Sequence, residues 1–417
     1  MSAETGTATL LVAPGQPGAY PTIGAALAAA PAGGVVSVSP GIYHEVLSVV
    51  DRAVTIVAAQ GPGTVTIDAG EGAYAAVSCG RGRLELRDLT LKGGDAPAVG
   101  AEQAQLTITG CALSSRSSAA VAVKDKTRFA LNRCVATGGR FGFLAEGSEG
   151  TIDGCEFTDV TEDGIIVRSG SAVTIRSCVV TRCGDSGVLV YGRAVPTIED
   201  CEISHTGGPG VAVAEEGVPV LRRCRILDTA GPGLTFADGC AGTVEECVTE
   251  RTGEPPVEIA PGATVLQARV RRPPAIVAAV VLMAPVAITW LVAGIAWMVV
   301  TSRLEGDALF LFWILAVFIL LLCLLVTLMA VVAMATAWYG VTNAMNLPAG
   351  FTLAVFVLAL VNLLVQHKIE YNPTMLTPLI VGSLAAVAAA LARSAPAKKW
   401  FATAATAKAI SRRRAGR

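Results

Sequence analysis

Seven cysteines recur along the chain at a nearly constant interval, and this repeat limits the possible folds more than any other feature. Five of the six intervals are identical, and the one between Cys134 and Cys155 is slightly shorter. A fixed period of about 23 residues is typical of a solenoid, in which each repeat is one coil stacked on the next. The seven residues are Cys111, Cys134, Cys155, Cys178, Cys201, Cys224 and Cys247.

Each repeat alternates apolar and polar residues on both sides of a polar turn. One unit reads VTIRSCVV over 173–180, and GVLV follows over 187–190. Alternation of period two predicts short strands. The first segment also fits part of a leucine-rich repeat, but that fold needs further leucines on a convex helical segment, where this chain has a strand-like Gly-[Ile/Val]-x-Val. The glycines of that segment, each nine residues after a cysteine, are Gly164, Gly187, Gly210 and Gly233.

The start of the chain carries a second signal for the fold. It reads YPTIGAALAAAP over 20–31 and then GVVSVSPGIYHE over 34–45. This resembles the opening of pectinesterase-type right-handed parallel β-helices, in which a short helix precedes a first coil ending in P-G-x-Y-x-E. The resemblance covers roughly residues 20–270. It implies an all-β right-handed parallel β-helix over residues 1–272, with an N-terminal cap and with coils of the length that the cysteine repeat indicates.

In such a stack the seven cysteines would form an internal column. We expect buried free thiols that act as small apolar side chains. A linear column inside a dry core does not bring thiolates together at one point, so we expect no metal there. The head would lie in a reducing compartment, which disfavours disulfides.

A column of charges of alternating sign runs beside the cysteines. One position, two residues before the cysteine, reads Asp153, Arg176, Glu199, Arg222 and Glu245 in successive repeats. Opposite charges on laterally neighbouring strands attract, and like charges repel. The alternation therefore favours an ion-pair ladder that fixes the register of the coils, and the alternative is a binding face for a carbohydrate or a protein.

Catalytic residues are not evident in the head. The later motifs that pectinesterases carry, of the D-F-I-F-G and L-G-R-P-W type, are absent. A loose acidic cluster of Asp159, Glu162, Asp163 and Asp185 supplies the weak candidates Asp163 and Asp185, since two carboxylates one coil apart could bind Ca²⁺ or act as an acid–base pair. Acidic residues beside glycine are also common in turns. The sequence favours a non-enzymatic role and predicts no cofactor and no metal.

The last third of the chain predicts membrane spans. The chain is 53% hydrophobic and 16% charged, and four apolar runs cover 275–300, 308–337, 349–365 and 376–391. A helix needs about 20 apolar residues to cross the hydrocarbon core. We therefore predict four transmembrane helices within 273–392, the fourth being the shortest, and a basic tail over 393–417. Such a bundle would contact membrane lipid and could oligomerise.

The distribution of charge predicts orientation. Residues 1–272 hold 22 Lys and Arg against 30 Asp and Glu, and the tail holds eight Lys and Arg and no acid. The positive-inside rule then places both termini in the cytoplasm, at the inner (plasma) membrane. Residues 1–30 show no signal-peptide pattern, which agrees with a cytoplasmic head. The acidic head disfavours nucleic acid as a partner.

Three functions fit these features. The first is a membrane-anchored scaffold that docks a cytosolic protein assembly, such as a phage-tail-like injection particle, because long repeat surfaces often bind proteins. The second is a carbohydrate-active or glycan-binding module, which a cluster of Asp163, Arg168, Asp185 and Tyr191 on one sheet would favour. The third is a channel or transporter with a regulatory head.

Overall fold

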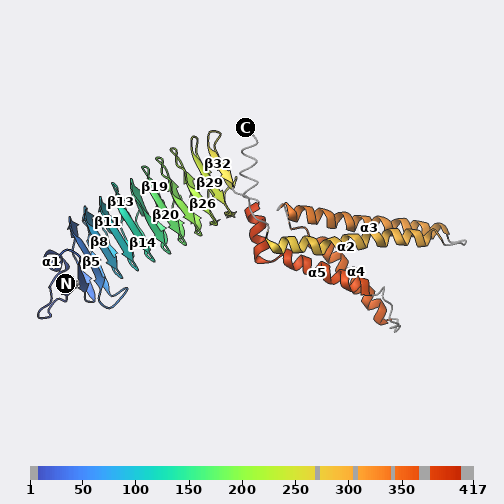
Figure 1. The fold of residues 1–417 in the computed structure, drawn as a ribbon, viewed down its shortest axis with the longest axis horizontal. Helices are drawn as coiled ribbons and strands as arrows, with labels where there is room; N and C mark the ends of the chain where they lie inside the picture. Colours follow the sequence, from blue (N-terminus) through green and yellow to red (C-terminus); the bar gives the residue numbers. More distant parts are fainter. Residues whose placement is uncertain (1–7, 268–272, 304–308, 340–342, 366–375, 405–417) are drawn as a thin grey trace, which may run out of the picture. The chain divides into compact units, whose positions relative to one another are not determined.

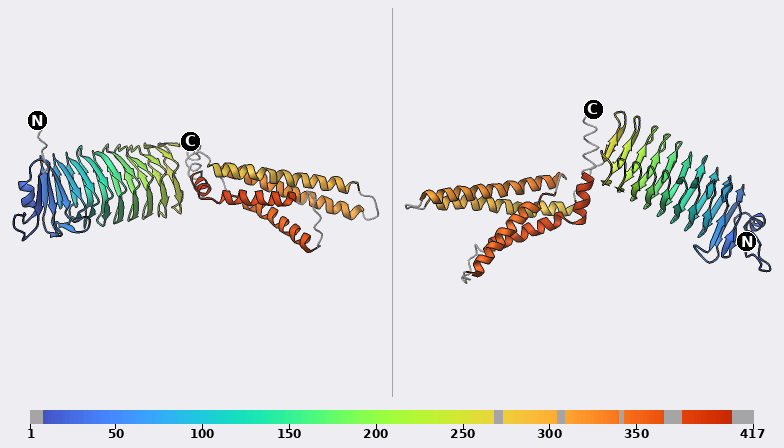
Figure 2. Two further views of the ribbon diagram at one scale, coloured as in Figure 1. Left: turned by 60° about the horizontal axis from the view of Figure 1, so that its bottom comes forward. Right: turned by 180° about the vertical axis from the view of Figure 1, so that it is seen from behind.

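The computed structural model describes residues 8–267, 273–303, 309–339, 343–365 and 376–404 (Figure 1). The chain divides at residues 269 and 270 into a β-solenoid and a unit of apolar helices. The solenoid has about 11 turns of about 23 residues, which confirms the predicted fold class. Figure 2 shows the stacked coils from two further sides.

Three sheets of parallel strands run along the solenoid, and each coil contributes one strand to each sheet. Sheet A contains β1 (Thr9–Val12), β2 (Gly34–Val38), β5 (Ala53–Ala58), β8 (Arg83–Arg87), β11 (Gln105–Thr109), β14 (Arg128–Asn132), β17 (Glu149–Asp153), β20 (Ala172–Arg176), β23 (Thr197–Glu199), β26 (Val220–Arg222), β29 (Ala241–Glu245) and β32 (Thr264–Gln267). Sheet B contains β3 (Gly41–Tyr43), β6 (Val65–Asp68), β9 (Thr90–Lys92), β12 (Ala112–Ser114), β15 (Val135–Thr137), β18 (Glu156–Val160), β21 (Val179–Cys183), β24 (Glu202–Thr206), β27 (Arg225–Leu227) and β30 (Val248–Glu250). Sheet C contains β4 (Leu47–Val50), β7 (Val77–Gly80), β10 (Val99–Glu102), β13 (Ala119–Lys124), β16 (Phe141–Glu146), β19 (Ile165–Arg168), β22 (Val188–Val190), β25 (Val211–Val213), β28 (Leu234–Phe236) and β31 (Val257–Ile259).

The motif at the start of the chain builds the first coil and its cap. Helix α1 (Ile23–Ala29) begins after Thr22, whose hydroxyl accepts a hydrogen bond from the backbone amide of Ala25. Glu45, the last residue of the opening motif, accepts from the amides of Ile23 (2.9 Å) and Gly24 (2.8 Å). A carboxylate at a helix N-terminus satisfies free amides and complements the helix dipole. The motif thus ties the cap to the first coil.

The core is a set of columns of identical or similar residues. Equivalent residues of neighbouring coils pair in register, as Ile175 and Ile198 do, and both are fully buried. The period-two alternation of each strand puts these residues inside and the polar ones outside. Burying a side chain of this size contributes about 1.5–3 kcal/mol.

The predicted cysteine column is one of these internal columns. All seven side chains are buried, and all eleven cysteines of the chain are free thiols. The thiol of Cys178 donates to the carbonyl oxygen of Arg176 at 3.0 Å. Burial raises the pKa of Cys111 to about 12. A thiol in this setting stays protonated at neutral pH and packs as a small apolar group.

The residue before each column cysteine turns the coil from sheet A to sheet B. Its φ is positive in every coil from Gly110 onwards, for example 54° at Asp200 and 52° at Arg223. This left-handed conformation is strained for residues other than glycine. A bidentate ion pair between Arg223 and Asp200, with both distances 2.7 Å, joins two such corners across neighbouring coils.

The second unit consists of helices α2 (Pro274–Thr301), α3 (Leu309–Trp338), α4 (Asn346–Val365) and α5 (Leu376–Ala392), and a short helix (Ala395–Ala404) bent by 60° from α5. Within the described residues, α2 and α3 are long and apolar enough to cross a membrane, and the bent pair would be a third candidate span. These candidates indicate a membrane protein. The third predicted span, 349–365, and the predicted orientation stay predictions.

Small residues line the contact between the apolar helices. Ala279 of α2, Ala333 of α3 and Ala388 of α5 are fully buried in one cluster. A β-carbon added at Gly294 would lie 2.9 Å from that of Cys323 on α3, so this glycine permits close approach. Small residues let helix backbones approach in the absence of a hydrophobic driving force in lipid. Large apolar side chains such as Phe310 and Leu311 are exposed on the outside.

Candidate binding groove

From Arg176 to Glu245 the predicted charge column forms an ion-pair ladder on sheet A, whereas Asp153 forms no ion pair within the described residues. Residues 153, 176, 199, 222 and 245 pair in register from coil to coil. The guanidinium of Arg222 lies between Glu199 (3.1 Å) and Glu245 (2.9 Å), and Arg176 lies 3.4 Å from Glu199. The acidic partners thus share one cation, and this shared pairing accounts for the alternation of sign. A role of this ladder in binding stays a prediction.

The two weak catalytic candidates occupy different environments. Asp163 is 6% exposed, and its Oδ1 accepts a hydrogen bond from the amide of Ser186 at 3.0 Å. Burial raises its pKa, and the nearby charges of Asp185 and Glu162 raise it further. Asp185 is exposed. In the described parts of the chain, no group of three His, Cys, Asp or Glu is arranged to hold a metal ion.

Asp163 and Asp185 precede strands β19 and β22, whereas Arg168 and Tyr191 form a cluster at the opposite end of these two strands. Arg168 donates from Nη1 to the hydroxyl of Tyr191 and from Nη2 to Glu146, both at 2.8 Å. These hydrogen bonds raise the pKa of the guanidinium. Asp163 precedes β19 and Arg168 ends it, so the strand separates the two predicted groups by roughly 16 Å at about 3.3 Å per residue. The four predicted residues therefore do not meet in one site.

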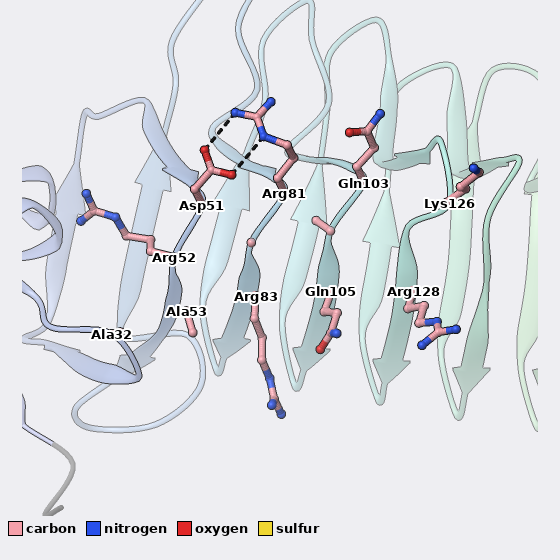
Figure 3. A pocket seen from close by; sticks show the side chains of 12 residues that line it. Ala32, Asp51, Arg52, Ala53, Arg81, Arg83, Gln103, Gln105, Lys126 and Arg128 are labelled. Carbon is pink, nitrogen blue, oxygen red and sulfur yellow. Dashed lines mark hydrogen bonds and ion pairs between the residues drawn. The ribbon is translucent and has the colours of Figure 1, made fainter.

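A groove lies where the chain passes from sheet C to sheet A, over the coils of β5 to β14 (Figure 3). Its volume is about 560 Å³. Figure 3 shows two rows of side chains along it. The outer row is Asp51, Arg81, Gln103 and Lys126, and the inner row is Ala53, Arg83, Gln105 and Arg128.

The backbone explains why these side chains line a groove. All four residues of the outer row have positive φ, between 47° and 63°, and form the corner of each coil. The inner row consists of the first residues of four neighbouring strands in register. Between the two rows, Gly82 approaches the carbonyl oxygen of Arg52 so closely that an added β-carbon would lie 2.5 Å from it. A side chain at position 82 would therefore collide with the backbone of the preceding coil, which restricts this position to glycine.

The groove is basic although the head is acidic. Its lining contains five cations and a single carboxylate, that of Asp51. Arg81 pairs with Asp51 at 2.9 Å and Arg128 pairs with Glu149 at 2.6 Å, and all four of these side chains are more than half exposed. Within the described residues, neither Arg83 nor Lys126 forms an ion pair. Exposed pairs contribute about 0–1 kcal/mol, so all these cations can be offered to an anionic ligand.

The sequence contains a signal for this groove that motif searches do not detect. The triplets Arg81-Gly-Arg83, Gln103-Ala-Gln105 and Lys126-Thr-Arg128 recur once per coil, each with a small residue in the middle. The triplets have no common sequence, because the middle one has glutamine where the other two have cations, so only their place in the coil relates them.

Comparisons with known proteins relate the solenoid to one type of fold. A family profile described as "Right handed beta helix region" matches residues 141–272. Pectate lyase Pel9A is similar in structure, with a TM-score of 0.50 and 13% identity over 64% of this chain and 79% of that one. Pectin methylesterase PemA from Erwinia chrysanthemi has a TM-score of 0.40 and 11% identity over 63% of this chain and 94% of that one. No curated protein sequence matches the chain.

Proposed function

We propose that this chain, whose first unit is a right-handed β-helix domain of the pectin-lyase-like type followed by candidate membrane helices, is a membrane-anchored module that binds a polysaccharide along the groove. The observation that carries the proposal is the groove itself, in which charged and amide side chains from four successive coils form two parallel rows. A ligand that contacts equivalent positions in several coils must be extended. The β-helix fold is shared with carbohydrate-active enzymes, at low identity.

The lining favours binding over bond cleavage. Glycoside hydrolysis by the usual mechanism needs two carboxyl groups that flank the bond. The groove offers one, and the guanidinium of Arg81 holds that carboxylate in a bidentate pair with distances of 3.0 and 2.9 Å. This pairing lowers the pKa of Asp51, which removes it from the range of a general acid.

The apolar unit would serve as the anchor. Helices α2 and α3 contain no Asp, Glu, Lys, Arg or His, and ion or proton paths through membranes usually require such residues. The anchor role therefore fits better than the channel or transporter role. If both termini are cytoplasmic, as the cation distribution predicts, the ligand would be a cytosolic or lipid-linked glycan.

Binding of oligosaccharides to the full-length protein in detergent tests the proposal. The variant Arg83→Glu with Lys126→Glu reverses two exposed cations that have no ion-pair partner within the described residues. Arg193→Glu is the control, because Arg193 is also exposed and its pair with Glu216 lies outside the groove. We expect loss of glycan binding in the double variant alone. The proposal is wrong if the wild type binds no glycan and if affinity purification recovers the same cytosolic protein assembly with the wild type and with the double variant. The docking scaffold is then the better hypothesis.

A further inference from the structure

Charge along the groove alternates with the coil. The coil of β8 presents Arg81 and Arg83, the coil of β11 presents Gln103 and Gln105, and the coil of β14 presents Lys126 and Arg128 (Figure 3). Both rows therefore change together from cationic to uncharged and back to cationic. A surface that only attracted anions would not need two amides at its centre.

The register fixes the spacing of these groups. Arg83 pairs with Gln105, and Gln105 pairs with Arg128, at the start of adjacent parallel strands. Adjacent strands lie about 4.8 Å apart, so the two cationic coils lie about 10 Å apart with the amides midway. An extended ligand thus meets a cation pair, an amide pair and a second cation pair at equal steps.

Each pair has its own chemical preference. Guanidinium and ammonium groups bind carboxylate or sulfate through charge-assisted hydrogen bonds. A glutamine amide is uncharged and both donates and accepts hydrogen bonds, which suits hydroxyl and amide groups. Resting on the proposed function, we propose that the ligand is an acidic polysaccharide in which an acidic sugar alternates with a neutral one, so that acid groups recur about every 10 Å along the chain.

Carboxylates close the groove at both ends. Asp51 stands before Arg81 in the outer row, and Glu149 follows Arg128 in register in the inner row. Both carboxylates are held in ion pairs with cations of the groove, and the two rows continue with Ala53 at one end and Gly147 at the other, so no further cation extends the pattern. The groove therefore contains the pattern of cation pair, amide pair and cation pair only once. A short oligosaccharide of one to two disaccharide units is long enough to occupy it.

The test is titration calorimetry of the full-length protein in detergent with three tetrasaccharides, the length that the groove is expected to hold. They are an alternating glucuronate–N-acetylglucosamine oligomer, a galacturonate homo-oligomer and a neutral cello-oligomer. We expect the alternating oligomer to bind at least about tenfold more tightly than either of the others, since one charge-assisted contact accounts for a factor of this size. The double variant Gln103→Arg with Gln105→Arg should reverse the preference in favour of the homo-oligomer. Both glutamines are exposed, and Arg81 and Lys126 adopt the same left-handed backbone as Gln103.

The outcomes separate the inference from the proposed function. If the homo-oligomer or the neutral oligomer binds as tightly as the alternating one, and Arg83→Gln with Lys126→Gln weakens that binding, the inference is overturned and glycan binding stands. If none of the three binds, both are overturned. The inference would also be overturned if inorganic polyphosphate bound with the same affinity as the alternating oligomer, because the groove would then select for negative charge alone.

Discussion

Asp163 accepts a hydrogen bond of 3.0 Å from the backbone amide of Ser186, one coil further along the solenoid. Burial raises the pKa of this carboxyl above its ordinary value of 3.8. A pKa that is higher in the folded state means that the folded protein binds more protons than the unfolded chain, so this residue lowers stability as pH rises through the window above 3.8.

We expect Asp163→Asn to remove that decline. Asparagine keeps the acceptor for Ser186 and carries no charge, so the variant should be at least as stable as the wild type at neutral pH and should gain relative to it as the pH rises from 3.8 towards neutral. Urea midpoints measured across this range give the comparison. A variant that loses more stability at the upper end of the range than at the lower end would contradict the assignment of burial as the cause.

The glycine that follows each polar turn is predicted to be a packing requirement. A β-carbon at Gly187 would collide with Cγ2 of Ile203 and lie 2.7 Å from the carbonyl oxygen of Gly210. Gly187→Ala should therefore destabilise the solenoid by about 1–3 kcal/mol, as overpacking of a core does. Gly100→Ala is the matched control, because the nearest atom to its β-carbon lies at 3.6 Å. Equal denaturation midpoints of the two variants would show that the close contact is relieved without cost.

The cysteine column should be chemically silent in the folded protein. The thiols are buried, and the pKa of Cys111 is raised to about 12, so the reactive thiolate is scarce at about pH 8. We expect a thiol reagent to label none of the ten solenoid cysteines in native protein and all ten in denaturant. Mass spectrometry of labelled peptides counts them. Rapid labelling of any column cysteine under native conditions would mean that the coil there opens readily.

Arg222 is expected to contribute more to stability than an arginine in a single pair. It separates Glu199 from Glu245, so Arg222→Met leaves two carboxylates facing each other across one coil. The melting temperature should fall, and added salt should recover part of the loss by screening. Arg193→Met, which breaks the single exposed pair with Glu216, should change it less. Similar melting curves for both variants would argue against a cooperative ladder.

Helices α2 and α3 are predicted to cross the membrane in opposite directions. Ser302 caps the C-terminal end of α2 and is exposed. A cysteine placed there should therefore react with an impermeant reagent from one side of the membrane, and a cysteine placed at position 2 should react from the other side. Labelling in sealed vesicles from both sides gives the answer. Labelling of both positions from the same side would exclude a span formed by α2.

The solenoid could be predicted from sequence because its information is local and repeated. The column of Cys178 and its equivalents, and the glycines such as Gly187, recur every coil, so each repeat restates the same constraint. The groove could not be found in this way, because Arg83, Gln105 and Arg128 do not repeat one residue type and become neighbours only through the register of three coils. Asp163 and Arg168 are close in sequence, but the extended strand β19 between them keeps the two side chains apart.

The in-register pairing of equivalent residues also sets how the length of this protein can vary. Removing one coil, from Val179 to Cys201, would join Cys178 directly to Glu202 and leave every column continuous, including the ladder, which would then run from Arg176 to Arg222 with one acidic residue missing. Two like charges would become neighbours. Removing two coils together restores the alternation, so the solenoid should tolerate changes in length most easily in steps of two coils.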